Sequence, residues 1–180
     1  HRDYAGAESY NVFHTPLAIA SWEPIAEILV ANGVAAKQDG HYVFNMERYL
    51  ELVRNETRWN QLANSAGYAV NKSMLISSAD VRTSNLAEMY LALASYVANG
   101  NNVVPSQSVA DPLMPLLEAL FLKQGYTEQA STALFDDYMT MGMGKAPLVM
   151  VYESQFIYAA AHALGGMQSG MVLMYPEPTL

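Results

Sequence analysis

Residues 72–99 read KSMLISSADVRTSNLAEMYLALASYVAN, in which an apolar run, a polar loop and an amphipathic pattern follow one another. The run 73–76 is typical of a short buried strand. Asn85 is the expected helix start, because it is a capping residue with a glutamate three residues later. Apolar residues then recur at helical spacing up to Asn99, where the following glycine favours the end of a helix. The stretch predicts one strand–loop–helix unit.

The loop of this unit is the strongest candidate binding site in the sequence. Its polar residues, with the residue at the helix start, are Ser77, Ser78, Asp80, Arg82, Thr83, Ser84 and Asn85. Hydroxyls and free amides at a helix start can hold a carboxylate, a phosphate or another oxyanion, and Arg82 can add a fork-shaped charge. The alternative is a solvated capping loop in which Arg82 pairs with Asp80 at the surface.

The rest of the chain repeats the alternation of strands and helices. Further strands are expected at 16–21, 40–44, 147–151 and 170–175. Further helices are expected from Trp22-Glu23-Pro24 to Gly33, after Asn45, from Asp111-Pro112, from Thr127 to Met141, and from Tyr152 to Leu164. This order predicts an α/β three-layer sandwich, with a mixed, mostly parallel sheet of about five strands flanked by helices.

In such a sheet the strand-to-helix turns gather at one edge. The turns at 21–22, 77–85 and 152–155 are therefore expected to meet there, which makes Tyr152 and Glu153 a second candidate site. Glu153 either complements the helix dipole or faces a donor-rich or cationic ligand. The second possibility conflicts with a purely anionic ligand, and the sequence leaves both open.

Composition excludes several classes of protein. The chain has 180 residues, 52% of them hydrophobic and 14% charged, which indicates a folded core. Its net charge of −8 argues against nucleic-acid binding. The absence of cysteine excludes disulfides and thiol nucleophiles. No apolar run is long enough for a membrane span, and no metal-ligand spacing, phosphate loop or nucleophile elbow is present. We therefore expect no metal, cofactor or catalytic residue.

Four segments together resemble a known family. They are TPLAIASW at 15–22, residues 50–62 ending in TRW, SSADVRTSN at 77–85, and residues 147–156 containing YESQ, followed by YPEPT at 175–179. Their order resembles the second lobe of type 2 extracytoplasmic solute-binding proteins, in particular the bacterial extracellular ones associated with von Willebrand factor A domains. The chain departs from the family's loop pattern at Ala79, Val81 and Leu86.

The resemblance implies a non-enzymatic protein that captures a small polar or anionic solute for import or sensing. It implies residues 14–180 as a single lobe, hinge segments near 15–22 and 152–178, and a loosely held segment at 1–13. The expected partners are the solute, the other lobe of the same protein, and an ABC transporter or a von Willebrand factor A domain. The expected location is extracytoplasmic, periplasmic or anchored at a bacterial cell surface as a lipoprotein.

The resemblance also names a ligand-facing set: Ser77, Ser78, Ser84, Asn85 and Tyr152, with Arg82 as a further candidate. The alternative function is an envelope protein–protein interaction module that keeps the fold without a small ligand. A third reading, a cytosolic α/β hydrolase-like enzyme, would require a histidine beside one of the loop serines.

Overall fold

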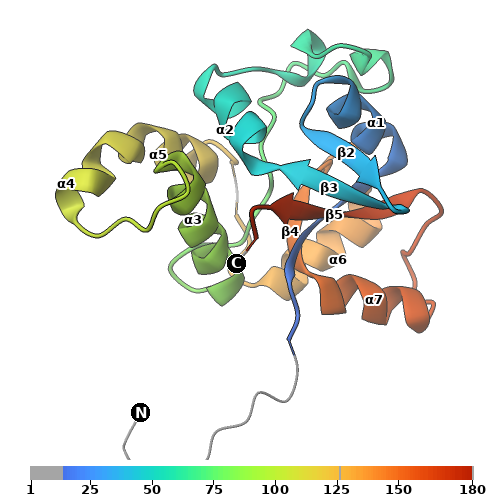
Figure 1. The fold of residues 1–180 in the computed structure, drawn as a ribbon. Coiled ribbons are helices and arrows are strands. Elements are labelled where there is room, and N and C mark those ends of the chain that lie inside the picture. The colour runs from blue at the N-terminus through green and yellow to red at the C-terminus, as the bar shows by residue number, and fades with distance from the viewer. Residues whose placement is uncertain (1–13, 126, 180) are drawn as a thin grey trace, which may run out of the picture.

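The computed structural model describes residues 14–125 and 127–179, so the expected loose segment 1–13 lies outside the described residues. It shows an α/β fold in which a five-stranded mixed sheet is packed with helices (Figure 1). The strands are β1 (Leu17–Trp22), β2 (Ala35–Gln38), β3 (His41–Asn45), β4 (Val149–Tyr152) and β5 (Met171–Glu177). The helices are α1 (Glu23–Ala31), α2 (Met46–Arg54), α3 (Asn85–Ala98), α4 (Gln107–Ala110), α5 (Met114–Leu122), α6 (Ser131–Met141) and α7 (Glu153–Ala161). Three 3-10 turns are η1 (Trp59–Gln61), η2 (Ser65–Tyr68) and η3 (Asp111–Leu113).

The sheet is mixed, as expected, but the prediction that it is mostly parallel is wrong. Its strand order is β2-β3-β5-β1-β4, and β3–β5 is the one parallel pair among the described strands. Two features account for this. Asp39 and Gly40 both have positive φ, 47° and 85°, and close β2 and β3 into a tight hairpin. β5 then enters the sheet between β3 and β1 and runs against β1.

The strand directions also correct the expected meeting of three polar turns. β1 runs antiparallel to β4, with Leu17 opposite Tyr152 and Ala20 opposite Val149. The end of β1 at Ser21 therefore lies at the far end of the sheet from Tyr152. Ser21 is fully buried there, and its hydroxyl donates to the carbonyl of Pro147 at 2.8 Å. That turn has a structural role.

Residues 73–77 form no regular strand, so the strand predicted at 73–76 is wrong in detail. The segment makes two isolated bridges, Arg58 with Ser73 and Ser77 with Val149. Ser77 N–H donates to Leu148 and its carbonyl accepts from Met150, both at 2.9 Å. These bonds attach the segment to the free edge of β4 and direct the following loop along that strand.

Local capping decides the helix starts. Asn45 caps α2 as predicted, because its Oδ1 accepts from Arg48 N–H at 2.9 Å. The cap of α3 is Ser84 and not the predicted Asn85, with Ser84 Oγ accepting from Ala87 N–H at 3.4 Å. At Asp111 the predicted start coincides with the 3-10 turn η3, which leads directly into α5 at Met114. The start predicted at Thr127 is wrong, since α6 begins at Ser131.

β1 is the centre of the core. All six of its residues are buried, which requires cover on both faces of the sheet. α3 and α7 both pack against β1 and β4, while α2, α3 and α5 form one helical group (Figure 1). No helix in the described part of the chain is long and apolar enough to cross a membrane.

Candidate functional site

A crevice of about 320 Å³ lies where the loop before α3 meets the start of α6. The polar residues that line it include Thr83, Ser84, Asn85, Ser131, Thr132 and Tyr152. We call it the polar crevice. Three of its residues, Ser84, Asn85 and Tyr152, belong to the predicted site. Among the described residues, no charged side chain lines it.

Two helix N-termini converge on the polar crevice. α3 contributes its first residues, Asn85 and Leu86, and α6 contributes Ser131 and Thr132. N–H groups in the first turn of a helix have no partner within the helix, and no side chain of a described residue caps α6. Each helix adds roughly half a positive charge at this end. The crevice is therefore suited to an oxyanion without a cationic side chain.

The loop before α3 is tied to the segment before α6, which fixes the two helix starts together. Asp80 N–H donates to the carbonyl of Glu128 at 2.8 Å. The hydroxyl of Thr83 donates to the carbonyl of Gln129 at 2.9 Å. Because both bonds are made within the chain, the crevice is preorganised, which lowers the entropic cost of binding.

Tyr152 forms a third wall of the polar crevice. It is the last residue of β4 and the N-cap of α7, and its backbone N–H donates to Gln155 Oε1 at 2.9 Å. This bond fixes the start of α7, while the half-buried phenol lines the crevice. The turns at 77–85 and 152–155 thus meet as predicted.

The start of β1 and the end of β5 lie at the same edge as Tyr152. The start of β1 is opposite Tyr152, and β5 runs antiparallel to β1, so its end at Glu177 lies beside that start. Figure 1 shows the C-terminal end close to the chain entering β1. Ser154 N–H donates to Thr15 Oγ1 at 3.1 Å, which holds the entering chain against α7.

Asp80 and Arg82 form a surface ion pair outside the polar crevice. Arg82 Nη2 lies 2.6 Å from Asp80 Oδ2, and Arg82 Nε lies 3.0 Å from Asp80 Oδ1. The Arg82 side chain is 83% exposed. The structure therefore agrees with the alternative prediction that Arg82 pairs with Asp80 at the surface and does not bind a ligand. Hydrogen bonds from the Arg82 side chain and backbone lower the pKa of Asp80 to about 2.

Arg82→Ala is expected to raise the pKa of Asp80 and to leave solute binding unchanged. The guanidinium bonds that favour the ionised carboxylate are lost, while the Arg82 N–H bond to Asp80 Oδ1 remains, so the pKa moves part of the way to its ordinary value. A carboxyl-carbon NMR titration of the variant and the parent measures the shift. Weaker solute binding by the variant would show that Arg82 belongs to the site after all.

Ser77 and Ser78 line a neighbouring pocket of about 280 Å³ and not the polar crevice. Ser78 is buried, and its N–H donates to Gln124 Oε1 at 2.8 Å. Gln124 Nε2 in turn donates to Ser78 Oγ at 3.1 Å. This reciprocal pair joins the loop to the end of α5, so the predicted residues do not form one continuous site.

Glu153 forms a hydrogen bond with a residue of β5. Its carboxylate accepts a hydrogen bond from the Tyr175 hydroxyl at 2.6 Å. Burial and this carboxylate raise the pKa of Tyr175 to about 12. Glu153 does not line the polar crevice, so the conflict that it posed for an anionic ligand does not arise there.

Ser131 and Thr132 were missed in the sequence because a helix predicted from Thr127 places them inside it. Their adjacent hydroxyls, following Gly125 and a polar segment, were the available signal for a later start.

No family model, curated protein or solved structure matches the chain.

Proposed function

We propose that this chain is the ligand-binding lobe of a two-lobe extracytoplasmic solute-binding protein and acts without catalysis. The polar crevice is its half of the solute site. The observation that carries the proposal is the convergence of the α3 start, the α6 start and Tyr152 on one preorganised crevice. The resemblance of the sequence to the second lobe of such proteins supports the same reading.

The lining of the polar crevice favours a small anionic solute held by neutral donors. Amide groups, hydroxyls and two helix dipoles favour an oxyanion such as a carboxylate or a tetrahedral inorganic anion. Thr83, Asn85 and Thr132 are exposed, so this wall covers only one side of a ligand. The other lobe would supply the opposite wall.

Capture follows from lobe closure. The hinge segments near 15–22 and 152–178 include the edge at which β1 starts and β5 ends, beside the polar crevice. A solute that contacts both lobes shifts the equilibrium towards the closed form. In this proposal the closed form is presented to an ABC transporter or a von Willebrand factor A domain at a bacterial cell envelope.

The second candidate is an envelope interaction module that keeps the fold without a small ligand. One observation favours it. Ile157 and Tyr158 on α7 are 52% and 58% exposed, beside an open, mainly apolar pocket of about 630 Å³ between α7 and β5. Exposed apolar surface of this kind often marks a protein contact.

A thermal-shift panel separates these two functions. Inorganic oxyanions, amino acids and sugars are added to the full chain at constant ionic strength. Capture of an anion by the polar crevice is expected to raise the melting temperature in a concentration-dependent way, because a ligand at one hundred times its Kd adds about 2.7 kcal/mol. If no solute stabilises the chain, the capture proposal fails and the interaction module becomes the better reading.

A further inference from the structure

Three lysines meet in a second pocket, at the opposite end of β4 from the polar crevice. Lys72, Lys123 and Lys145 line this pocket of about 270 Å³, together with Pro147, which precedes β4. We call it the lysine pocket. The whole chain has nine lysines and arginines and a net charge of −8. Among the described residues, no carboxylate lines it.

The lysines come from three separate parts of the chain. Lys72 precedes the bridge at Ser73, Lys123 is the C-cap of α5, and Lys145 lies in the turn before β4. The fold therefore assembles the cluster, which is why no short sequence motif indicates it. Lys123 and Lys145 are each paired with a carboxylate from outside the pocket, so their charges reach a ligand only when those pairs open.

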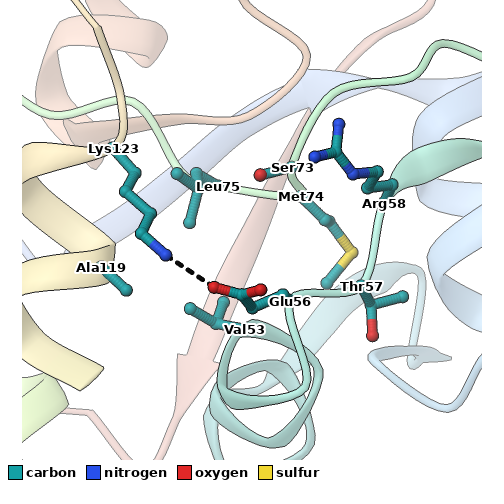
Figure 2. Close-up of a pocket in the computed structure, with 9 residues that line it drawn as sticks. All are labelled: Val53, Glu56, Thr57, Arg58, Ser73, Met74, Leu75, Ala119 and Lys123. Carbon is teal, nitrogen blue, oxygen red and sulfur yellow. Dashed lines mark hydrogen bonds and ion pairs between the residues drawn. The ribbon is translucent and has the colours of Figure 1, made fainter. Parts of the chain in front are cut away.

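The ammonium groups can turn towards a ligand. Lys123 pairs with Glu56 at 2.7 Å, and Figure 2 shows this pair crossing an adjoining pocket. Lys145 pairs with Asp137, which lines another neighbouring pocket. The Lys123–Glu56 pair is exposed and stabilises the fold little, so exchanging it for a ligand has a small cost. Within the described chain, Lys72 forms no ion pair.

The remaining lining adds neutral donors and a rigid wall. Ser73 and Ser77 contribute hydroxyl-bearing side chains. Trp59 is 1% exposed and packs edge-on against Tyr68, which makes that wall stiff. When the pairs to Glu56 and Asp137 open, three ammonium groups and two hydroxyls form a donor set that can recognise a phosphate or sulfate group.

We propose that the lysine pocket binds a phosphate or sulfate group, either as the free anion or as a monoester. The site is separate from the polar crevice, because residues 148–151 lie between Pro147 and the crevice wall at Tyr152. The lobe thus carries two anion sites of different chemistry, one built from helix termini and one from lysines.

Isothermal titration calorimetry of the full chain with inorganic phosphate, and in parallel with glycerol 3-phosphate, tests the proposal at constant ionic strength. Saturable binding of either compound is expected, and tighter binding of the ester would identify a monoester as the source. The double variant Lys72→Gln, Lys145→Gln is expected to weaken binding at least tenfold. Lys37→Gln, which removes an exposed lysine on β2, is expected to change it less than twofold.

A tryptophan fluorescence titration tests whether the anion binds in the lysine pocket. The chain has two tryptophans, so Trp22→Phe leaves Trp59 as a single reporter in the wall of the lysine pocket. The change in Trp59 emission is expected to give the same Kd as the calorimetric titration. The proposal is overturned by an absence of saturable binding, by equal weakening in Lys37→Gln, or by loss of phosphate binding on Asn85→Asp, which would place the anion in the polar crevice.

Discussion

Asn85→Asp is expected to weaken solute binding at the polar crevice more than tenfold without loss of stability. The two side chains have nearly the same shape, so the change adds only a negative charge at the first residue of α3. A carboxylate there favours the helix by about 0.3–1 kcal/mol. The added charge repels an anion bound in the crevice. At an effective dielectric constant of about 20, two like unit charges about 8 Å apart repel by about 2 kcal/mol, and 1.4 kcal/mol corresponds to a factor of ten.

Gln38→Glu is the matched control for this prediction. It makes the same change of charge at an exposed position on β2, which lies at the opposite edge of the sheet from β4. Calorimetry with the most stabilising oxyanion of the panel compares the two variants with the parent. Equal losses in both variants would show a general effect of net charge, and unchanged binding by Asn85→Asp would remove the α3 start from the site.

Tyr49→Phe is expected to lower the free energy of unfolding by about 1–3 kcal/mol, the cost of leaving a buried polar group unpaired. Tyr49 is fully buried, and burial raises its pKa to about 12, so the hydroxyl is neutral at pH 7. That hydroxyl accepts from Ile76 N–H at 3.0 Å and lies 3.2 Å from the Tyr90 hydroxyl. Phenylalanine keeps the ring and leaves both groups without this partner.

Tyr90→Phe provides the control, because it removes the bond between the hydroxyls and keeps the bond from Ile76 to Tyr49. Its cost is expected to be about half that of Tyr49→Phe, since one bond is lost instead of two. Urea unfolding curves of the parent and the two variants give the comparison. If Tyr90→Phe lowers the free energy of unfolding more than Tyr49→Phe does, the hydrogen bond from Ile76 is not the main contribution of the Tyr49 hydroxyl.

The features predicted correctly from the sequence are those decided by neighbouring residues. The cap at Asn45, the helix after Trp22-Glu23-Pro24 and the buried run of β1 all depend on contacts within a few positions. The direction of the sheet depends on β5 entering beside β1, more than one hundred and forty residues away in the chain. The Asp39-Gly40 pair was a local signal for an antiparallel hairpin and was overlooked.

The residues of the candidate site also fall into those that local sequence patterns indicate and those that depend on distant contacts. Ser84, Asn85 and Tyr152 were identified because polar turns after strands are typical binding positions, and the structure brings them together. Ser131 was missed because its role depends on where α6 begins and on the bond from Thr83 to Gln129. The lysine pocket was not predicted, because no spacing pattern joins residues from three separate segments.

An amide chemical-shift map of the ¹⁵N-labelled chain, titrated with the oxyanion that gives the largest thermal shift, tests the solute site most directly. N–H groups at the starts of two helices are proposed to hold the anion, so their signals report on it without substitution. The largest saturable changes are expected at Asn85 and Leu86 of α3 and at Ser131–Ala133 of α6. Changes confined to the surroundings of Lys72 and Lys145, or an absence of saturable changes, would contradict solute capture by the polar crevice.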